Sequence, residues 1–508
     1  MKKIFLAFIA MTSMAVEAQN IGDALRYSTS DLTGTARFRA MSGAFGGLGG
    51  DLSALDVNPA GSAVFLNSFA SISLGFDKKS NDVVYFDGFT NSSNSNVNLG
   101  QAGAVFVFNG ANPENPWRKF TLGFNYSTTK NFENDFLAAG MGNNTIADYF
   151  LGYANGIPLD LLVPLADESI ADLYSYLGQN QGFGAQQAFL GVQGFVIQPT
   201  DPDDFTGTTY RSLINSAPGN FDQTYNYAAT GLNGKFSFNF ATQYGDNLYL
   251  GANLNSHFIN YEKVTSYEEI NFNEGSETNL VYFENSLSTL GSGFSFQLGG
   301  IAKLGSNLRI GAAYESPTWY TISEETTEYL ESGVANSNGT IEITDVVDPR
   351  IINIYPDYKL QTPGKYTGSL AYLFGTQGLI SFDYSYKDYS TMKFKPTSDP
   401  DFAIQNDLMA GQLKGASSFR LGGEYRIEDF SLRGGYRLEE SPYTDEDMMG
   451  DLTGYSLGLG YNFGNIKLDV AYDRSQQDRN YEFFPSFTNG AYIDEENSNV
   501  TLTLSFGI

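Results

Sequence analysis

The stretch Val500-Thr501-Leu502-Thr503-Leu504-Ser505-Phe506-Gly507-Ile508 decides the fold class of this chain. Apolar residues take every second position in it, and small or polar residues take the positions between. That period of two predicts a β-strand with one apolar face. A final strand of this kind, with an aromatic residue near its end, is typical of outer-membrane β-barrels.

The same alternation recurs upstream. It is clearest at residues 236–240, 248–254, 380–386, 419–425 and 466–472. In a soluble sandwich the apolar face of a strand points inward, whereas in a membrane barrel it faces lipid. The strands alone do not separate these two architectures, so the connections between them have to decide.

Short and long connections alternate along the chain. The short ones are rich in Gly, Asn and Asp, which supply the positive φ of tight hairpins. There are 6 short and 7 long connections, 13 in all, and hence 14 strands. The short connections are 109–119, 244–247, 304–307, 374–378, 427–429 and 463–465. The long connections are 77–96, 131–227, 261–287, 320–361, 388–415, 439–452 and 474–498.

An even number of strands, with short turns on one side and long loops on the other, is the pattern of outer-membrane barrels. The sequence therefore predicts an all-β fold: a 14-stranded antiparallel transmembrane β-barrel over residues 68–508. Both ends of the barrel chain would lie on the periplasmic side, and residues 131–227 would form the largest extracellular loop.

The composition excludes several classes of protein. The 508 residues carry a formal charge of −28, which opposes binding to a phosphate backbone and argues against a nucleic-acid partner. The chain has no Cys and one His, so we expect no metal site and no cofactor. Charged residues make up 17 % of the chain, below the quarter or so that is usual for a soluble domain.

The first 18 residues read as a secretory signal peptide. Lys2 and Lys3 precede a short apolar segment, and Val16-Glu17-Ala18 places small residues around a cleavage site before Gln19. No other stretch reaches 18 apolar residues. We therefore expect export by the Sec route and insertion in a bacterial outer membrane, in contact with lipid and lipopolysaccharide.

Residues 19–67 precede the first strand and are rich in Gly, Ala and Ser. A piece of this size cannot bury a core alone, and we expect it to form a plug inside the barrel; a periplasmic tail is the alternative. The Gly/Ala run, Asp51, and Asn58-Pro59-Ala60 just before the first strand resemble the hatch of the FadL/OMPP1/TodX family of hydrophobic-compound transporters.

That resemblance implies 14 strands and an N-terminal hatch that moves to open a route. It also implies that extracellular loops catch a hydrophobic ligand, which enters a lumenal pocket and leaves sideways at a kinked third strand. The third strand expected here, Phe120 to Thr128, contains no Pro and only Gly123 to mark such a kink.

The largest loop is expected to contain a helix. Pro164 would open it, Asp167 and Glu168 would occupy its first turn, and Gly178 would end it. One face of this helix is apolar and is a candidate ligand-collecting groove; the alternative is that it packs against the barrel mouth. Its residues are Ile170, Leu173, Tyr174 and Leu177.

If apolar faces point to lipid, the alternating positions of the late strands place charges in the lumen. Arg420, Arg433 and Arg437 are candidates to hold a carboxylate of a ligand by paired hydrogen bonds. The alternative is a ladder of salt bridges that braces the barrel and the hatch. The other charges expected to face inward are Glu424, Arg426, Lys467, Asp469 and Asp473.

The sequence gives little support for an enzyme. Gly454-Tyr455-Ser456-Leu457-Gly458 matches the pattern of a serine-hydrolase elbow, but it lies in an alternating strand. The favoured function is passive, hatch-gated uptake of small hydrophobic compounds such as long-chain fatty acids. The alternative is a non-transporting barrel of the same architecture that docks partner proteins or secretion machinery.

Overall fold

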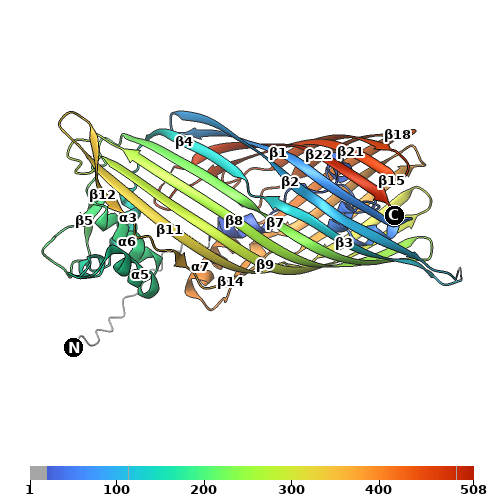
Figure 1. The fold of residues 1–508 in the computed structure, drawn as a ribbon, viewed down its shortest axis with the longest axis horizontal. Helices are drawn as coiled ribbons and strands as arrows, with labels where there is room; N and C mark the ends of the chain where they lie inside the picture. The colour runs from blue at the N-terminus through green and yellow to red at the C-terminus, as the bar shows by residue number, and fades with distance from the viewer. Residues whose placement is uncertain (1–19, 113, 488) are drawn as a thin grey trace.

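The computed structural model describes residues 20–112, 114–487 and 489–508, and the expected signal peptide lies outside these residues. These residues form one closed antiparallel β-barrel (Figure 1). It is built from 17 strand segments, and three barrel strands are each divided into two segments, which gives the 14 strands expected from the connections. The divided strands are β3/β4, β10/β11 and β14/β15.

The segments of the barrel wall are β1 (Phe69–Tyr85), β2 (Gly88–Asn109), β3 (Trp117–Asn131), β4 (Asn134–Gly142), β7 (Phe221–Tyr244), β8 (Leu248–Ile270), β9 (Leu280–Leu304), β10 (Leu308–Glu315), β11 (Trp319–Ala335), β14 (Tyr358–Gln361), β15 (Lys365–Phe374), β16 (Gly378–Asp388), β18 (Gly415–Ile427), β19 (Phe430–Glu439), β20 (Leu452–Asn462), β21 (Ile466–Tyr481) and β22 (Ala491–Gly507).

The barrel closes where the last strand pairs with the first. The β1–β22 ladder runs from Phe69 opposite Gly507 to Val84 opposite Tyr492. Closure removes the free sheet edges that would otherwise leave unpaired backbone groups in lipid. The alternating C-terminal stretch therefore completes the wall.

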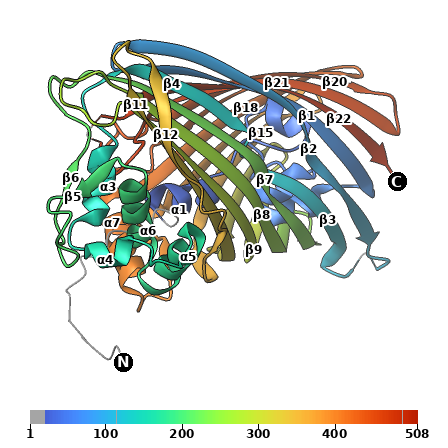
Figure 2. The same ribbon diagram turned by 60° about the vertical axis from the view of Figure 1, so that its left-hand side comes forward.

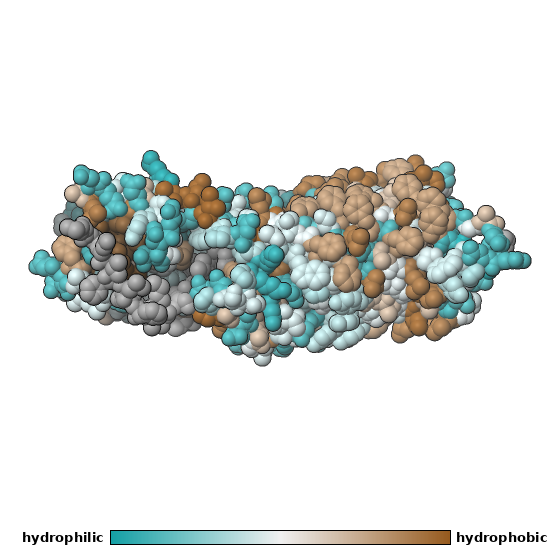
Figure 3. All heavy atoms as spheres, turned by 90° about the horizontal axis from the view of Figure 1, so that it is seen from below, coloured by the Kyte–Doolittle hydropathy of each residue, from teal (hydrophilic) through white to brown (hydrophobic). Residues whose placement is uncertain are grey.

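The apolar face of the strands points outward. On β20 Leu459 is 58 % exposed, whereas Asp469 on β21, which pairs with the next residue Gly460, is buried in the lumen. In Figure 3 hydrophobic residues form a band over the half of the barrel nearer the C-terminal end, and hydrophilic residues prevail over the other half. This is the polarity of a barrel that spans a membrane.

The wall is much taller on one side than on the other. The tall wall includes β1, β2, β7, β8 and β9, which have 17 to 25 residues each. The low wall consists of β15, β16, β18, β19 and β20, which have 10 to 13 residues each. A membrane crossing needs about 9–11 residues, so the tall wall continues well beyond the bilayer.

This extension corrects several expectations from the sequence, because β1, β2, β4, β8, β9, β11, β21 and β22 all run into connections that were expected to be loops. Residues 77–96 are not a loop: β1 and β2 pair up to Tyr85 opposite Gly88. The outward positions change from apolar residues to Lys78, Ser80 and Asp82, while the strand continues. Loss of the apolar pattern marks the membrane border here, and the strand ends later.

The third barrel strand is interrupted at Phe132 and Glu133, between β3 and β4. The expected segment 120–128 lies inside β3, and its pairing with β7 shifts register between Thr128 and Lys130. β2 pairs with β3 only over residues 101–109. Nearer the loop end, where β2 no longer pairs with β3, hydroxyl groups of β2 donate hydrogen bonds to the backbone of β4. For example, Ser92 Oγ donates to the carbonyl of Asp135 at 2.7 Å.

Residues 20–67, called the plug below, lie inside the barrel (Figure 1). Their elements are α1 (Ile21–Ser28), α2 (Ala36–Ala40), η1 (Ser53–Asp56) and η2 (Pro59–Val64). Asn20 begins α1 with a reciprocal capping box to Asp23. The segment η2 packs against β7, β8 and β9, and α2 packs against β20, β21 and β22.

The other helices lie in the loops. The large loop contains α3 (Ala147–Ala154), α4 (Leu159–Leu162), α5 (Ile170–Asn180) and α6 (Phe183–Gln193), with a small sheet of β5 (Ile197–Pro199) and β6 (Tyr210–Ser212). Figure 2 shows these helices gathered at one end of the barrel, against the tall wall. The remaining elements are β12 (Ile341–Val347), β13 (Asn353–Ile354), η3 (Tyr389–Thr391), β17 (Lys393–Lys395) and α7 (Pro400–Gln412).

Within the described residues, none of the helices combines the length and the hydropathy needed to span a membrane.

Candidate functional site

Buried ion pairs join the plug to the late strands. Arg37 Nε lies 2.8 Å from Glu424 Oε2, and Arg39 Nε lies 2.7 Å from Asp473 Oδ1. The side chains of Arg39 and Asp473 are only 6 % and 8 % exposed. Further plug contacts come from Lys119, Lys235, Arg309 and Asp383 on the wall. The plug is therefore fastened by charge as well as by packing.

The four residues of the expected hatch motif all hold local structure. Asp51 accepts hydrogen bonds from Thr35 Oγ1 at 2.7 Å and from the amide of Ser53 at 2.9 Å. Asn58 caps η2 through the amide of Ala60, and its Nδ2 donates to the carbonyl of Gly300 on β9 at 3.0 Å. Pro59 occupies the first turn of η2. The motif thus shapes the plug and seats it on β9.

Glycine residues of the inner wall make room for the plug. A Cβ placed at Gly251 would lie 2.5 Å from the backbone of Pro59 and Ala60, and one at Gly299 would lie 2.1 Å from Asn58 Oδ1. Neither glycine was predicted from the sequence to contact the plug. Gly at an inward position of an otherwise regular strand is the signal that indicates a close backbone approach.

The structure brings together Arg420, Arg433 and Arg437, as expected for inward positions, but it places them differently. Arg433 is buried between Glu424 and Asp469. Arg437 lies 3.7 Å from Glu439, and Arg420 lies 3.0 Å from the same carboxylate. All three arginines thus belong to a salt-bridged ladder, and of the three only Arg420 also borders the main cavity of the lumen. Their role as ligand groups stays a prediction.

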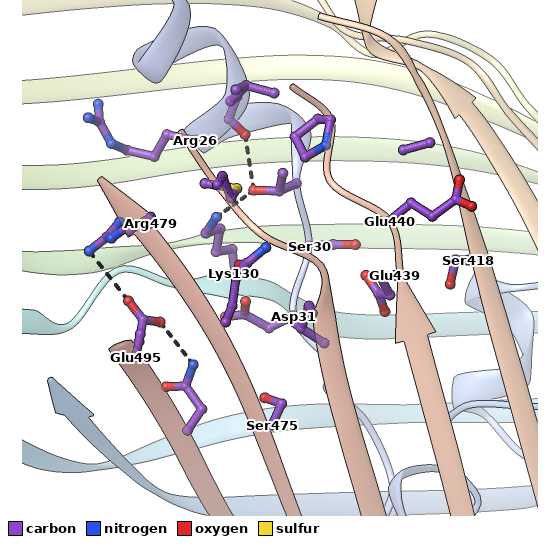
Figure 4. A pocket seen from close by; sticks show the side chains of 18 of the residues that line it. Arg26, Ser30, Asp31, Lys130, Ser418, Glu439, Glu440, Ser475, Arg479 and Glu495 are labelled. Carbon is purple, nitrogen blue, oxygen red and sulfur yellow. Dashed lines mark hydrogen bonds and ion pairs between the residues drawn. The ribbon is translucent and has the colours of Figure 1, made fainter. Parts of the chain in front are cut away.

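A cavity of about 340 Å³ lies in the lumen above the plug (Figure 4). In Figure 4 Arg26, Lys130, Arg479 and Glu495 project from one side, and Ser418, Glu439 and Glu440 project from the other. The floor is formed by α1 and the segment after it. The cavity is therefore bordered by the plug, both walls and the loops above the low wall.

Among the described residues, two lysines of the cavity form no ion pair, and two of its ion-paired arginines keep an Nε atom without a partner. Lys130 Nζ bonds to Thr29 Oγ1, and Lys387 Nζ donates to the carbonyl of Ser28 at 3.1 Å. The Nε atoms of Arg420 and Arg479 are buried and have no hydrogen-bond partner in the part of the chain that the structure describes. Donors in excess of acceptors favour an anionic group in this space.

One side of the cavity is aromatic. Phe132, Tyr227, Tyr261 and Tyr481 line it. The rings of Phe132 and Tyr261 lie 5.0 Å apart, and the hydroxyls of Tyr227 and Tyr261 lie 3.0 Å apart. Phe132 is also the residue at which the third strand is interrupted. The aromatic side of the cavity thus adjoins the break in the wall.

The predicted groove residues of the large loop are mostly buried. Leu173, Tyr174 and Leu177 belong to an apolar cluster that joins the loop helices to the tall wall, and Ile170 packs against it. Tyr174 also donates a hydrogen bond of 2.6 Å to Glu328 on β11. This face packs on the barrel mouth, and binding of a ligand by these residues stays a prediction.

The expected start and end of this helix were wrong. Ser169 caps α5 through a capping box with Asp172, and the helix runs past Gly178 to Asn180. Pro164 therefore lies outside α5. The Ser-x-x-Asp spacing was the stronger local signal, because it satisfies two backbone amides at once.

The remaining candidates have structural roles. His257 faces the lumen, where its Nε2 lies 2.9 Å from Ser295 Oγ. The Gly454–Gly458 segment lies in β20 and is paired on both sides, so it forms no nucleophile elbow. No group of three or more His, Asp and Glu residues suited to a metal ion occurs within the described ranges.

Residues 252–483 match the family model described as outer membrane protein transport protein (OMPP1/FadL/TodX). The match confirms the resemblance, although it does not include the Asn58-Pro59-Ala60 motif that suggested it. No curated protein matches the chain.

Among solved structures, a Pseudomonas aeruginosa FadL homologue is 10 % identical to the chain, with a TM-score of 0.53, and covers 94 % of this chain and 99 % of its own. The P. putida toluene transporter TodX is 13 % identical, with a TM-score of 0.52 and the same two coverages. At such identities the comparison shows a shared fold.

Proposed function

We propose, from the OMPP1/FadL/TodX domain that residues 252–483 carry, that this protein passes small hydrophobic compounds inward across the bacterial outer membrane. Long-chain fatty acids are the compounds that suit it best. The observation that supports this is the lumenal cavity of about 340 Å³, whose lining includes aromatic residues and two lysines that form no ion pair among the described residues.

The aromatic and the cationic residues of the lining suit the two ends of such a ligand. The apolar tail lies along Phe132, Tyr227 and Tyr261, and the carboxylate lies near Lys130 and Lys387. Transfer of the tail from water to lipid supplies about 0.8 kcal/mol per CH₂, so passive flow needs no energy source. The interruption of the third strand at Phe132 and Glu133 provides the side exit.

The plug closes the periplasmic half of the lumen in this state. Opening the route requires either its movement or the side exit, and Asn58-Pro59-Ala60 links the plug to β9. We assign no chemical reaction to the protein.

Uptake measurements test the proposal. Cells that contain the protein should take up a fluorescent hexadecanoic acid faster than cells that lack it. The double variant Lys130→Gln/Lys387→Gln should lower that uptake by at least about 100-fold, because each charge-assisted hydrogen bond contributes about 1.5–3 kcal/mol and about 1.4 kcal/mol corresponds to a factor of ten.

The methyl ester of the same acid and the exposed Lys359→Gln variant are the controls. Uptake of the ester should be insensitive to the double variant, since it has no carboxylate, and Lys359→Gln should leave both compounds unaffected. Equal uptake of the acid with and without the protein would rule out transport.

A non-transporting docking barrel is the second candidate. It is favoured by the plug, which fills the periplasmic half of the lumen and is held by the buried Arg37–Glu424 and Arg39–Asp473 pairs. In that case the uptake experiment should show no difference, and copurification of a partner protein from the native membrane should depend on the loops.

A further inference from the structure

The axial route into the cavity is blocked by the loop helices. Phe483, Phe484 and Phe487 belong to the same buried cluster as α3, α5 and α6, together with inner-face residues of the tall wall such as Tyr267. Glu269 on β8 holds the start of α3 through Thr145 and the amide of Ile146 at 2.5 and 3.1 Å. An element with this much buried contact opens rarely.

The low wall is covered by two segments that differ in their packing. Residues 389–414, between β16 and β18, belong to a buried apolar cluster with α1, whereas the segment 440–451 between β19 and β20, called the strap below, is held more lightly. At one end the strap meets the C-terminus of α7 through a single bridge between Leu413 and Tyr443. At the other end it meets β21 through an isolated bridge between Met449 and Arg479, and the side chains of Gln477 and Asn480 donate to the carbonyls of Gly450 and Asp447. The outer ion pair Lys414–Glu446 is solvent-exposed and adds little stability.

The inner face of the strap forms part of the main cavity. Pro442, Tyr443, Met448 and Met449 all line it, as does Leu452 at the start of β20. Methionine side chains are unbranched and adapt to ligands of different shapes. The strap therefore offers an adaptable apolar surface to anything that passes beneath it, and no barrel ladder has to break when it lifts.

We propose that the strap is the lid of the lumenal cavity and that ligand enters sideways over the low wall, not axially through the loop helices. This rests on the proposed function, since it specifies the entrance to the same cavity. An entrance differs from a binding residue in one measurable way: closing it slows association and dissociation alike and leaves the equilibrium constant unchanged.

The absence of Cys from the chain permits a clean test by cross-linking. In the variant Leu413→Cys/Tyr443→Cys the two residues lie directly opposite in a bridge, a geometry that suits a disulfide. The purified full-length variant is mixed with pyrene-labelled hexadecanoic acid, and binding is followed by stopped-flow fluorescence before and after oxidation. Oxidation should slow association at least tenfold, leave Kd within about twofold, and be reversed by a reducing agent.

The matched control is Gln198→Cys/Arg211→Cys, which cross-links β5 to β6 within the loop that carries the helices. Oxidation of this variant should leave the association rate unchanged. The entrance is overturned if oxidised Leu413→Cys/Tyr443→Cys binds at the reduced rate, or if the control is the variant that slows. If neither the reduced variants nor the unmodified protein binds the probe, the proposed function fails. That outcome is distinct from failure of the entrance proposal alone, in which the probe binds but oxidation does not change its association rate.

Discussion

Arg39 shows how a single charged residue ties the plug to the barrel. Its guanidinium and the Asp473 carboxylate are both removed from solvent and bond at 2.7 and 3.0 Å. Replacing both by apolar residues would be tolerated better than replacing one, because one partner alone leaves a buried charge uncompensated.

Arg39→Leu should therefore destabilise the plug by about 3–5 kcal/mol. Loss of hydrogen-exchange protection across residues 20–67 measures this effect. Arg474→Leu, which removes the exposed pair with Glu496, is the control and should change stability by less than about 1 kcal/mol. Equal effects of the two variants would contradict the assigned role of Arg39.

Gly251 is required because it has no side chain, which lets the backbone of the plug lie close to β8. Gly251→Ala places a methyl group against plug backbone that has no flexible side chain to move aside. We expect a cost of about 1–3 kcal/mol and faster exchange of the amides of residues 58–64. Gly368→Ala is the control, since nothing lies within 4 Å of its Cβ position; similar exchange in both variants would show that the plug is not tightly seated.

At the scale of elements, α3 depends on the side chain of Glu269. Glu269 lies near the loop end of β8. The outward positions of β8 turn mostly polar after Phe258, so Glu269 lies outside the membrane-spanning part of the strand. Burial raises the pKa of Glu269 from 4.5 to about 7, against the opposing effect of hydrogen bonds from Thr145 and Tyr267.

The docked loop consequently holds more protons than the undocked loop between pH 4.5 and about 7. Docking of α3 should be strongest below pH 4.5 and should weaken by up to about 3 kcal/mol as the pH rises through 7. Hydrogen exchange of residues 147–154, corrected for the intrinsic rate at each pH, measures this. Glu269→Gln should abolish the dependence, and an identical slope in that variant would assign it to another group.

The elements also show what the sequence can and cannot predict. Alternation identified the spanning parts of the strands, because lipid forces every second residue to be apolar. It missed the parts of β1 and β2 nearest the loops. Outside the membrane the outward positions face water, so polar residues such as Lys78 and Asp82 can occupy them and the alternation is lost. The break at Phe132 carries no Pro or Gly signal, since it depends on how β2, β4 and β7 meet.

The candidate site was predicted only in part. The inward position of Arg420, Arg433 and Arg437 followed from alternation. The cavity beside Lys130 and Lys387 did not, because these residues lie far apart in the chain and are brought together by barrel closure and by α1. Leu173 and Leu177 were identified as one apolar face, and only the packing of the loop decides what that face covers.

For the whole molecule, the net charge of −28 matters for the approach of a ligand. An anionic ligand is repelled over a distance set by the Debye length, about 10 Å at 0.1 M salt. Association of hexadecanoic acid with the purified protein should therefore accelerate severalfold when the salt concentration rises from about 20 to 150 mM. Its methyl ester should show no such acceleration, and a parallel change for both compounds would point to an effect of salt on micelles.

The plug contacts strands from both ends of the chain: the amide of Ala36 donates to Thr503 Oγ1 on β22 at 2.7 Å, and Lys119 on β3 donates to the carbonyl of Phe65 at 2.6 Å. It lies inside a ring that is sealed by pairing of β1 with β22. These contacts connect the plug to strands on both sides of the β1–β22 seam, so the plug helps to hold the two ends of the sheet together where the barrel closes.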